Sequence, residues 1–151
     1  MKLYASPLQG FTEAPWRNIH HELFGGIDAY YTPFVRVEKG EFRNKDIRDI
    51  EKENNKVTCL IPQLIASTPA ELEKRVGLFM DRGYREPDIN MGCPFPLLTM
   101  RHKGSGILPY PSEVKVLLNE LAHYPEMKFS VKMRLGWEYY DEWRQVLPLL
   151  N

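Results

Sequence analysis

The 151-residue sequence predicts an α/β fold, because short apolar runs rich in β-branched and aromatic residues alternate with amphipathic helical stretches. Strands that follow one another through helices run parallel. A doubly wound sheet and a (β/α)8 barrel both fit this order. The first strand-to-helix turn, at residues 7–12, lacks the GxGxxG pattern of a dinucleotide-binding sheet. A barrel of the TIM type is therefore favoured, here an incomplete one of about five βα units.

Five strands are expected, at residues 2–6, 29–34, 58–66, 88–91 and 129–133. Each of these segments lies between turn or breaker residues such as Gly25, Gly83 and Pro125. A full barrel of this type needs about 250 residues. The chain therefore has room for little more than half of one.

The helix signals differ in strength. A first helix near residues 16–24 presents Trp16, Ile19 and Leu23 on one side, and residues 35–56 read as a long polar connection with some helix. The clearest helix follows the third strand: Thr68 is expected as N-cap, Pro69 at the first position and Glu71 at the third, which is a capping box. This helix should end at Gly83. The next should be capped by Ser112 and end before Pro125.

Composition excludes several classes of protein. Hydrophobic residues make up 43% of the chain, enough for one domain with a core, and 20 basic residues balance 20 acidic ones. The neutral total argues against a surface that is basic throughout, although a local basic patch could still bind RNA. The two cysteines form no CxxC pair, and no apolar run is long enough for a membrane span or a signal peptide. We expect a cytoplasmic protein without disulfides and without membrane contact.

Polar segments fall where the expected strands end, which is where a barrel of this type places its chemistry. On the fifth strand Ser130, Lys132 and Arg134 alternate with apolar residues, so Lys132 does not face the covering helices. A lysine that points into a barrel must be paired, hydrated or directed at an anionic ligand. The alternative is a lysine whose ammonium reaches solvent from the strand end.

Cys93 lies in a Gly-Cys-Pro turn that would present its sulfur outward, whereas most cysteines are small buried hydrophobes. Cys59, within an apolar run, is expected to be buried. Gln63 interrupts an apolar strand, and if it points inward it needs a partner, either a ligand edge or a core amide.

The segment 101–106 mixes positive charge with glycine, which suits a nucleic-acid backbone but is also common in surface loops. His20 and His21 stand in a helix without other ligand types at useful spacing. We therefore expect no metal site.

Five segments together resemble the tRNA-dihydrouridine synthase family in order and spacing. They are Ser6-Pro7-Leu8 with Gly10, Thr12 and Arg17; Pro62-Gln63-Leu64; Asp88-Ile89-Asn90-Met91-Gly92-Cys93-Pro94; Lys103-Gly104-Ser105-Gly106; and Val131-Lys132-Met133-Arg134-Leu135-Gly136-Trp137. The Asn-Met-Gly-Cys-Pro element is the most specific of them. Ser6-Pro7-Leu8 replaces the more common Ala-Pro-Met, and this change removes no reacting group.

The resemblance implies an FMN enzyme that uses NADPH to saturate the C5–C6 double bond of a uridine in tRNA. Cys93 would then be catalytic, giving a proton to C5 while reduced flavin delivers hydride to C6. Its cofactor contacts would come from Pro7, Leu8, Gln63 and Lys132, and its substrate contacts from Asn90 and Arg134. The target base would have to leave its stack to reach the flavin.

The resemblance also implies a domain boundary. Residues 1–151 match the N-terminal portion of the FMN-binding barrel, whereas the C-terminal barrel half and the helical tRNA-binding domain have no counterpart. A half barrel leaves edge strands unpaired, so self-association is expected. Two alternatives stand beside the synthase: a truncated, non-catalytic fragment, or another FMN barrel oxidoreductase that acts on a small molecule.

Overall fold

The structure is a computed structural model that describes residues 1–150. The chain divides into two compact units, Met1–Gln63 and Leu64–Asn151. In each unit the main strands alternate with helices and pair in parallel. Within each unit these parallel strands are neighbours in chain order, without the reversal of order that marks a doubly wound sheet. The fold class is α/β of the incomplete TIM-barrel type, as the sequence predicts.

The first unit contains three parallel strands, β1 (Tyr4–Ala5), β2 (Ala29–Phe34) and β5 (Leu60–Leu64). Tyr4 pairs with Ala29 and Tyr30 with Leu60, which places β2 between the other two strands. All three lie within the predicted segments, and β2 has the predicted bounds. The central position explains why β2 is almost entirely buried, since its neighbours cover both edges.

The polar connection after β2 is more structured than the sequence indicates. It forms an antiparallel hairpin of β3 (Val37–Glu38) and β4 (Glu41–Phe42), the helix α2 (Asn44–Ile50) and the short helix η1 (Lys52–Asn54). The predicted helical content is present. The hairpin was not predicted, because its strands of two residues are too short to show an alternating pattern.

Helix α1 (Ala14–Leu23) forms where a helix is predicted, but its apolar face is not the one that packs. Trp16, Ile19 and Leu23 are exposed, whereas Ala14 and Arg17 are buried. The buried face relies on hydrogen bonds of the Arg17 guanidinium rather than on apolar contact. Periodicity locates this helix but misidentifies its packed side.

The second unit begins with α3 (Pro69–Asp81), whose capping box forms as predicted. Thr68 Oγ1 accepts the Glu71 N–H at 3.3 Å, and Glu71 Oε2 accepts the Ser67 N–H at 3.0 Å. Leu72, Val76 and Phe79 are fully buried on one face of the helix. Burial of each such side chain stabilises the fold by about 1.5–3 kcal/mol.

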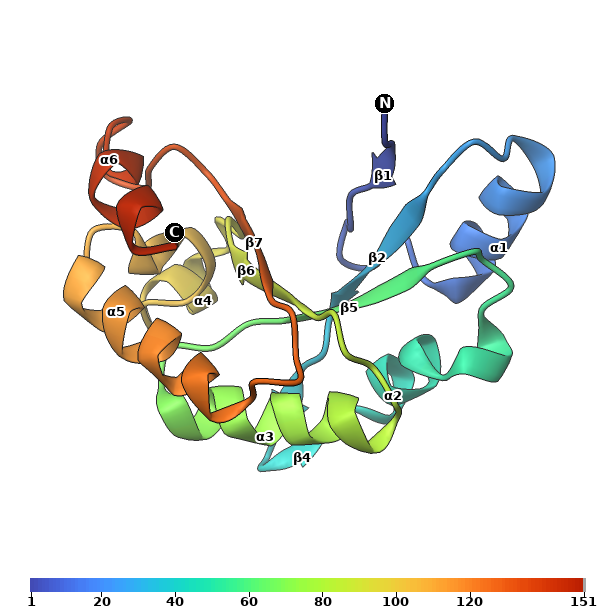
Figure 1. The fold of residues 1–151 in the computed structure, drawn as a ribbon, viewed down its shortest axis with the longest axis horizontal. Helices are drawn as coiled ribbons and strands as arrows, with labels where there is room; N and C mark the ends of the chain where they lie inside the picture. Colours follow the sequence, from blue (N-terminus) through green and yellow to red (C-terminus); the bar gives the residue numbers. More distant parts are fainter. Residues whose placement is uncertain (151) are drawn as a thin grey trace. The chain divides into compact units, whose positions relative to one another are not determined.

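Two parallel strands, β6 (Asp88–Met91) and β7 (Ser130–Met133), lie at the centre of this unit. The helix α5 (Pro111–Glu120) packs beside α3 (Figure 1). Short elements fill the loops: α4 (Pro96–Thr99), η2 (Gly104–Ile107), η3 (Leu121–His123), α6 (Trp143–Val146) and η4 (Leu147–Leu150). The core of the unit lies between the strands and the two long helices, where Ile89 and Leu117 are buried.

Two local predictions are wrong. Ser112 does not cap α5, because the helix begins at Pro111, two residues earlier than a Ser112 N-cap would place it, with Tyr110 at the N-cap and no side-chain cap. Proline has the backbone angle of a first helical residue, and this preference outweighs the capping preference of serine. Cys59 is partly exposed rather than buried, because it precedes the first residue of β5.

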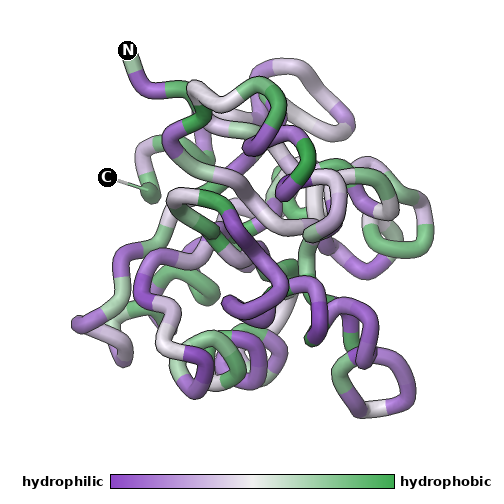
Figure 2. The backbone as a smooth tube through the Cα atoms, turned by 90° about the vertical axis from the view of Figure 1, so that its right-hand side faces the viewer, coloured by the Kyte–Doolittle hydropathy of each residue, from purple (hydrophilic) through white to green (hydrophobic). Residues whose placement is uncertain are grey.

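Neither Cys59 nor Cys93 is in a disulfide. Hydrophilic and hydrophobic stretches alternate along the backbone (Figure 2). Among residues 1–150, no helix has the length and apolar character needed to cross a membrane.

Candidate active site

The pairing of β6 with β7 brings the predicted site residues of the second unit together. Asn90 lies opposite Lys132, and Met91 lies opposite Met133. Because the strands are parallel, their carboxyl ends meet at one edge, where the loops that carry Cys93 and Arg134 begin. The edge therefore combines a thiol, an amide, an ammonium and a guanidinium from segments about 40 residues apart in the chain.

Asn90 shapes the loop that carries the thiol. Its side chain is 5% exposed, and its Oδ1 accepts the N–H of Gly92 at 3.0 Å and of Cys93 at 2.8 Å. This arrangement turns the chain sharply as it leaves the strand. Asparagine suits the position because its amide oxygen can accept from two amides at once.

A second set of contacts holds the Cys93 carbonyl. That oxygen accepts the N–H and the hydroxyl of Ser105, both at 3.0 Å. Gly104 has a φ of +60°, and a Cβ built there would lie 2.4 Å from the same carbonyl oxygen. Only glycine lets η2 approach so closely, and the approach fixes the backbone at Cys93. The thiol itself is partly exposed and has no hydrogen-bond partner among residues 1–150.

Lys132 and Arg134 approach the same loop from β7. A Cβ built at Gly92 would lie 3.3 Å from Lys132 Nζ, so the ammonium lies beside the space that glycine leaves open. Lys132 is partly buried and forms no hydrogen bond or ion pair within the described part of the chain. Arg134 Nε donates to the Gly92 carbonyl at 2.7 Å, while the residue as a whole remains exposed. Lys132 is thus a partly buried cation near the thiol loop without a partner in the described chain.

The segment after the thiol loop uses two of its three predicted basic residues internally. Lys103 forms an ion pair with Glu71 and is only 12% exposed. The His102 ring stacks on Tyr110 with centroids 3.9 Å apart, and its Nδ1 lies 2.9 Å from the Glu113 carboxylate. Arg101 alone remains exposed, so a contact with nucleic acid at this segment rests on that side chain.

Glu71 connects the start of α3 to the segment behind Cys93. Burial would raise the pKa of its carboxyl, but the hydrogen bonds from Lys103 and from the Ser67 amide outweigh burial and lower it. The carboxylate therefore stays charged in the folded protein. Through Lys103, Glu71 supports the segment that follows the Cys93 loop, and Glu71 is not itself one of the predicted site residues.

In the first unit, two of the predicted cofactor residues lie in the loop between β1 and α1. Leu8 is 58% exposed, and its N–H donates to Thr12 Oγ1 at 2.8 Å. Gly10 has a φ of +84°, which suits the tight turn between them. Pro7 precedes this turn and is partly exposed. The loop is compact and presents an apolar side chain outward.

Gln63 lies at the carboxyl end of β5 and is 1% exposed. Its backbone N–H donates to Thr32 Oγ1 at 3.1 Å, and its carbonyl accepts the Val35 N–H at 3.1 Å. Gln63 is buried, as expected whether its side-chain partner is the edge of a ligand or an amide of the core. Its backbone is fixed by the neighbouring strand.

The sequence did not reveal the residues that support these loops. Ser105 donates to the Cys93 carbonyl, Glu71 accepts from the Ser67 amide and pairs with Lys103, and Glu142 Oε atoms accept the N–H groups of residues 137–139 at 2.6–3.1 Å. Glu71 had a local signal in the capping box and Ser105 stood in a family motif, but neither supporting contact was predicted. Among residues 1–150, no group of three metal-ligating side chains comes together.

The site has the features of an α/β barrel enzyme, with a cysteine on the loop after one parallel strand and a lysine on the next. The model of the dihydrouridine synthase family matches residues 3–150. The chain therefore belongs to the dihydrouridine synthase family.

Individual relatives agree with this assignment. The chain is 26% identical over 137 residues to tRNA-dihydrouridine synthase B of Klebsiella pneumoniae, covering 91% of this chain and 42% of the relative. It is also 26% identical over 136 residues to the proteins of that name in Shigella flexneri and Escherichia coli K12, covering 90% of this chain and 42% of each relative. The chain thus spans about two-fifths of the length of these relatives.

Replacement of Gly104 tests the close approach to Cys93. Gly104→Ala should destabilise the protein by roughly 2 kcal/mol or more, because positive φ alone costs about 1–2 kcal/mol and the backbone clash adds to it. Gly26→Ala is the matched control, since Gly26 has a φ of +70° but nothing within 4 Å of an added methyl group. Urea unfolding of both variants measures the difference. Equal losses would show that the contact with Cys93 is not restrictive.

Replacement of Glu71 tests how much its negative charge contributes to the stability of the fold. Folding lowers the pKa of the Glu71 carboxyl. Glu71 therefore stabilises the folded protein at pH values above the pKa that it has in the unfolded chain. This stabilisation is lost as the pH falls through its pKa in the folded protein. Glu71→Gln should lower stability near neutral pH by about 1–2 kcal/mol. The variant should also lose less stability than the wild type between about pH 7 and about pH 3.

Denaturant titrations at the two pH values measure this change. Glu73→Gln, an exposed carboxylate on the same helix, serves as the control and should keep the wild-type pH dependence. An unchanged acid dependence in Glu71→Gln would exclude Glu71 as its source.

Proposed function

We propose that this chain is the catalytic part of a tRNA-dihydrouridine synthase, in which Cys93 gives a proton to C5 of a uracil base. One observation carries the proposal: a partly exposed, unpaired thiol on a rigid loop, with the unpaired ammonium of Lys132 beside the same loop in the described chain. Family membership and the names of the relatives supply the reaction class.

The chemistry needs a proton donor with a fixed position and a free hydrogen. Asn90 and Ser105 hold the backbone on both sides of the thiol, so little conformational freedom is lost when the base arrives. A thiol can release its proton as negative charge develops at C5. After transfer, the thiolate lies near the positive charges of Lys132 and Arg134, which stabilise it.

We propose FMN as the cofactor, which would be reduced by NADPH and would supply the hydride for C6. Lys132 is a partly buried cation without a partner in the described chain, and such a cation suits a ligand with anionic character. Lys132 and Gln63 would contact the ring system, and Pro7 with Leu8 would supply apolar contact. We place Asn90 and Arg134 near the base, although Asn90 Oδ1 and Arg134 Nε already hold the loop.

The substrate would be a tRNA, as the names of the relatives say of them. One nucleotide would leave its stack and enter the site, and the remaining recognition would follow the shape of the RNA. Arg101 and Arg134 are exposed cations that could meet phosphates near that nucleotide. A tRNA substrate is also consistent with a cytoplasmic protein.

The decisive variant is Cys93→Ala. In the whole gene product it should keep FMN binding and flavin reduction by NADPH, while formation of dihydrouridine falls by about 100- to 10,000-fold because the proton donor is lost. The assay follows NADPH oxidation and dihydrouridine content with tRNA that lacks the modification.

Cys59→Ala is the control and should keep activity, because that thiol precedes β5, at the opposite end of the strand from Gln63. Full turnover in Cys93→Ala would remove Cys93 as the donor. Turnover of a free small molecule, with none on tRNA, would favour the other FMN barrel enzymes.

A further expectation concerns the 151-residue chain by itself. We propose that it forms the N-terminal portion of the catalytic barrel and that the remaining barrel half and a helical domain complete the enzyme. Expressed alone, it should bind FMN weakly, reduce little tRNA and self-associate, because strand edges remain open. Titration with FMN and analytical ultracentrifugation measure these properties. A monomer with one equivalent of FMN and measurable tRNA reduction would contradict the expectation.

A further inference from the structure

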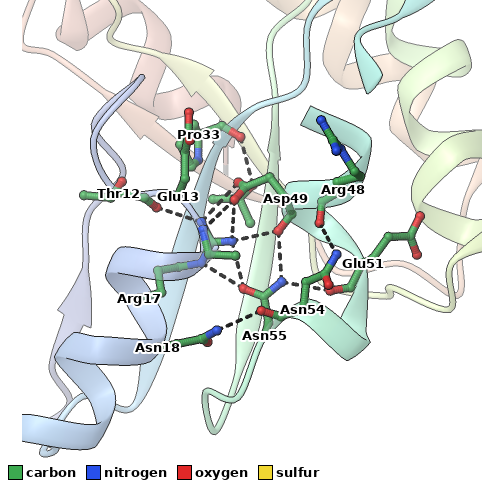
Figure 3. A network of polar contacts seen from close by, with 12 residues as sticks. Thr12, Glu13, Arg17, Asn18, Pro33, Arg48, Asp49, Glu51, Asn54 and Asn55 are labelled. Atoms are coloured by element: carbon green, nitrogen blue, oxygen red, sulfur yellow. Dashed lines mark hydrogen bonds and ion pairs between the residues drawn. The ribbon is translucent and has the colours of Figure 1, made fainter. Parts of the chain in front are cut away.

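Arg17 is the most completely buried charge among the described residues of the first unit, with no exposed surface. Its guanidinium lies between the β1–α1 loop, the end of α2 and Asn55 (Figure 3). Nη1 donates to the Thr12 carbonyl at 2.7 Å, Nη2 donates to the Asp49 carbonyl at 2.7 Å, and Nε donates to Asn55 Oδ1 at 3.1 Å. The network therefore joins the β1–α1 loop to α2 and to the residue after η1.

The charge is compensated as well as hydrogen-bonded. Asp49 Oδ1 lies 3.0 Å from Nη2 and Asp49 Oδ2 lies 3.2 Å from Nη1, so the ion pair is bidentate. Asp49 Oδ1 also accepts the Ala14 N–H at 2.6 Å and so caps α1, a role that the N-cap residue Glu13 does not fill. Every nitrogen of the Arg17 guanidinium has a partner. Arginine suits this position because its planar guanidinium offers five N–H donors to acceptors of Thr12, Asp49 and Asn55, whereas a lysine ammonium has only three.

Thr12 connects the Arg17 network to the exposed loop that contains Leu8. Its carbonyl is held by Arg17, while its hydroxyl accepts the Leu8 N–H at 2.8 Å. The N–H groups of Phe11 and Thr12 return to the Leu8 carbonyl at 3.0 and 3.1 Å. The conformation of Leu8 thus depends on Thr12, and Thr12 is tied to the buried part of the unit by Arg17.

We propose that Arg17 is a positioning residue for flavin binding, which acts through Thr12 to hold Pro7 and Leu8 in the conformation that receives the isoalloxazine ring. The inference rests on the proposed function, since it takes Pro7 and Leu8 as flavin contacts. Arg17 itself touches no ligand. Its effect is to keep the loop in its binding conformation before the cofactor arrives, and affinity falls in proportion to the fraction of time the loop spends elsewhere.

The test compares Arg17→Lys with Asn18→Ala in the whole gene product. Asn18 lies next to Arg17 on α1 and also bridges to the η1 region, through Asn54 O and the Lys56 N–H at 2.8 Å each, but it does not contact the loop. Thr12→Val is the second variant. It removes the hydroxyl that holds Leu8 and leaves Arg17 in place, so the test does not depend on the folding of Arg17→Lys.

Amide hydrogen exchange and FMN titration are the two readouts. Arg17→Lys and Thr12→Val should speed exchange at Leu8, Phe11 and Thr12 and weaken FMN binding by about tenfold or more, if the loop is then competent about a tenth of the time. Asn18→Ala should change neither. In the double variant FMN affinity should fall no further than in the worse single one, because both substitutions break the same connection.

Other outcomes overturn the inference. Faster loop exchange with unchanged FMN affinity would show that the loop does not receive the flavin, while dihydrouridine formation by the wild type would leave the proposed function intact. The same loss of FMN affinity in Asn18→Ala would show a general effect of loosening α1. A wild-type protein that binds no FMN would overturn both the cofactor assignment and this inference.

Discussion

The parallel register of β6 and β7 is the constraint on which the candidate site depends. Asn90 can face Lys132 only if Asp88 pairs with Ser130, and a shift by one residue would turn each side chain to the opposite face. The apolar residues that alternate with them, such as Ile89, fix this register because they must stay in the core. Burial of apolar surface thereby decides where the polar groups stand.

The loop beyond β6 shows how the backbone on both sides of a partly exposed thiol is held in place. Asn90 holds the loop from before the thiol, Ser105 from after it, and Arg134 from the next strand. Gly104 permits the approach that makes the second of these contacts possible. Each anchor uses backbone atoms of the loop, so the cysteine side chain stays free for chemistry. This division suits a proton donor, which has to be fixed in position without being hydrogen-bonded to the protein.

Much of the secondary structure was predictable because its causes are local. The bounds of β2 and β6, and the Thr68-Pro69-Glu71 start of α3, follow from β-branched runs and capping chemistry that a few adjacent residues define. The exposed apolar side of α1 was not predictable. Hydrophobic periodicity shows that the two faces of a helix differ in polarity. Which face is buried depends on the segment that packs against the helix, and here that segment carries Asp49, which accepts hydrogen bonds from Arg17.

The sequence by itself determined the α/β order and the family motif, because these depend on residue types at short spacing. Only the tertiary structure decided which groups support them. Arg17 and Asp49 are 32 positions apart, as are Lys103 and Glu71, and no pattern within a helix or strand marks either pair. Such pairs form because packing brings segments together, and burial then requires each charge to find a partner. The sequence motif identified Cys93, whereas the rigidity of its loop arises from contacts with Ser105 and Arg134, which only the folded chain brings to it.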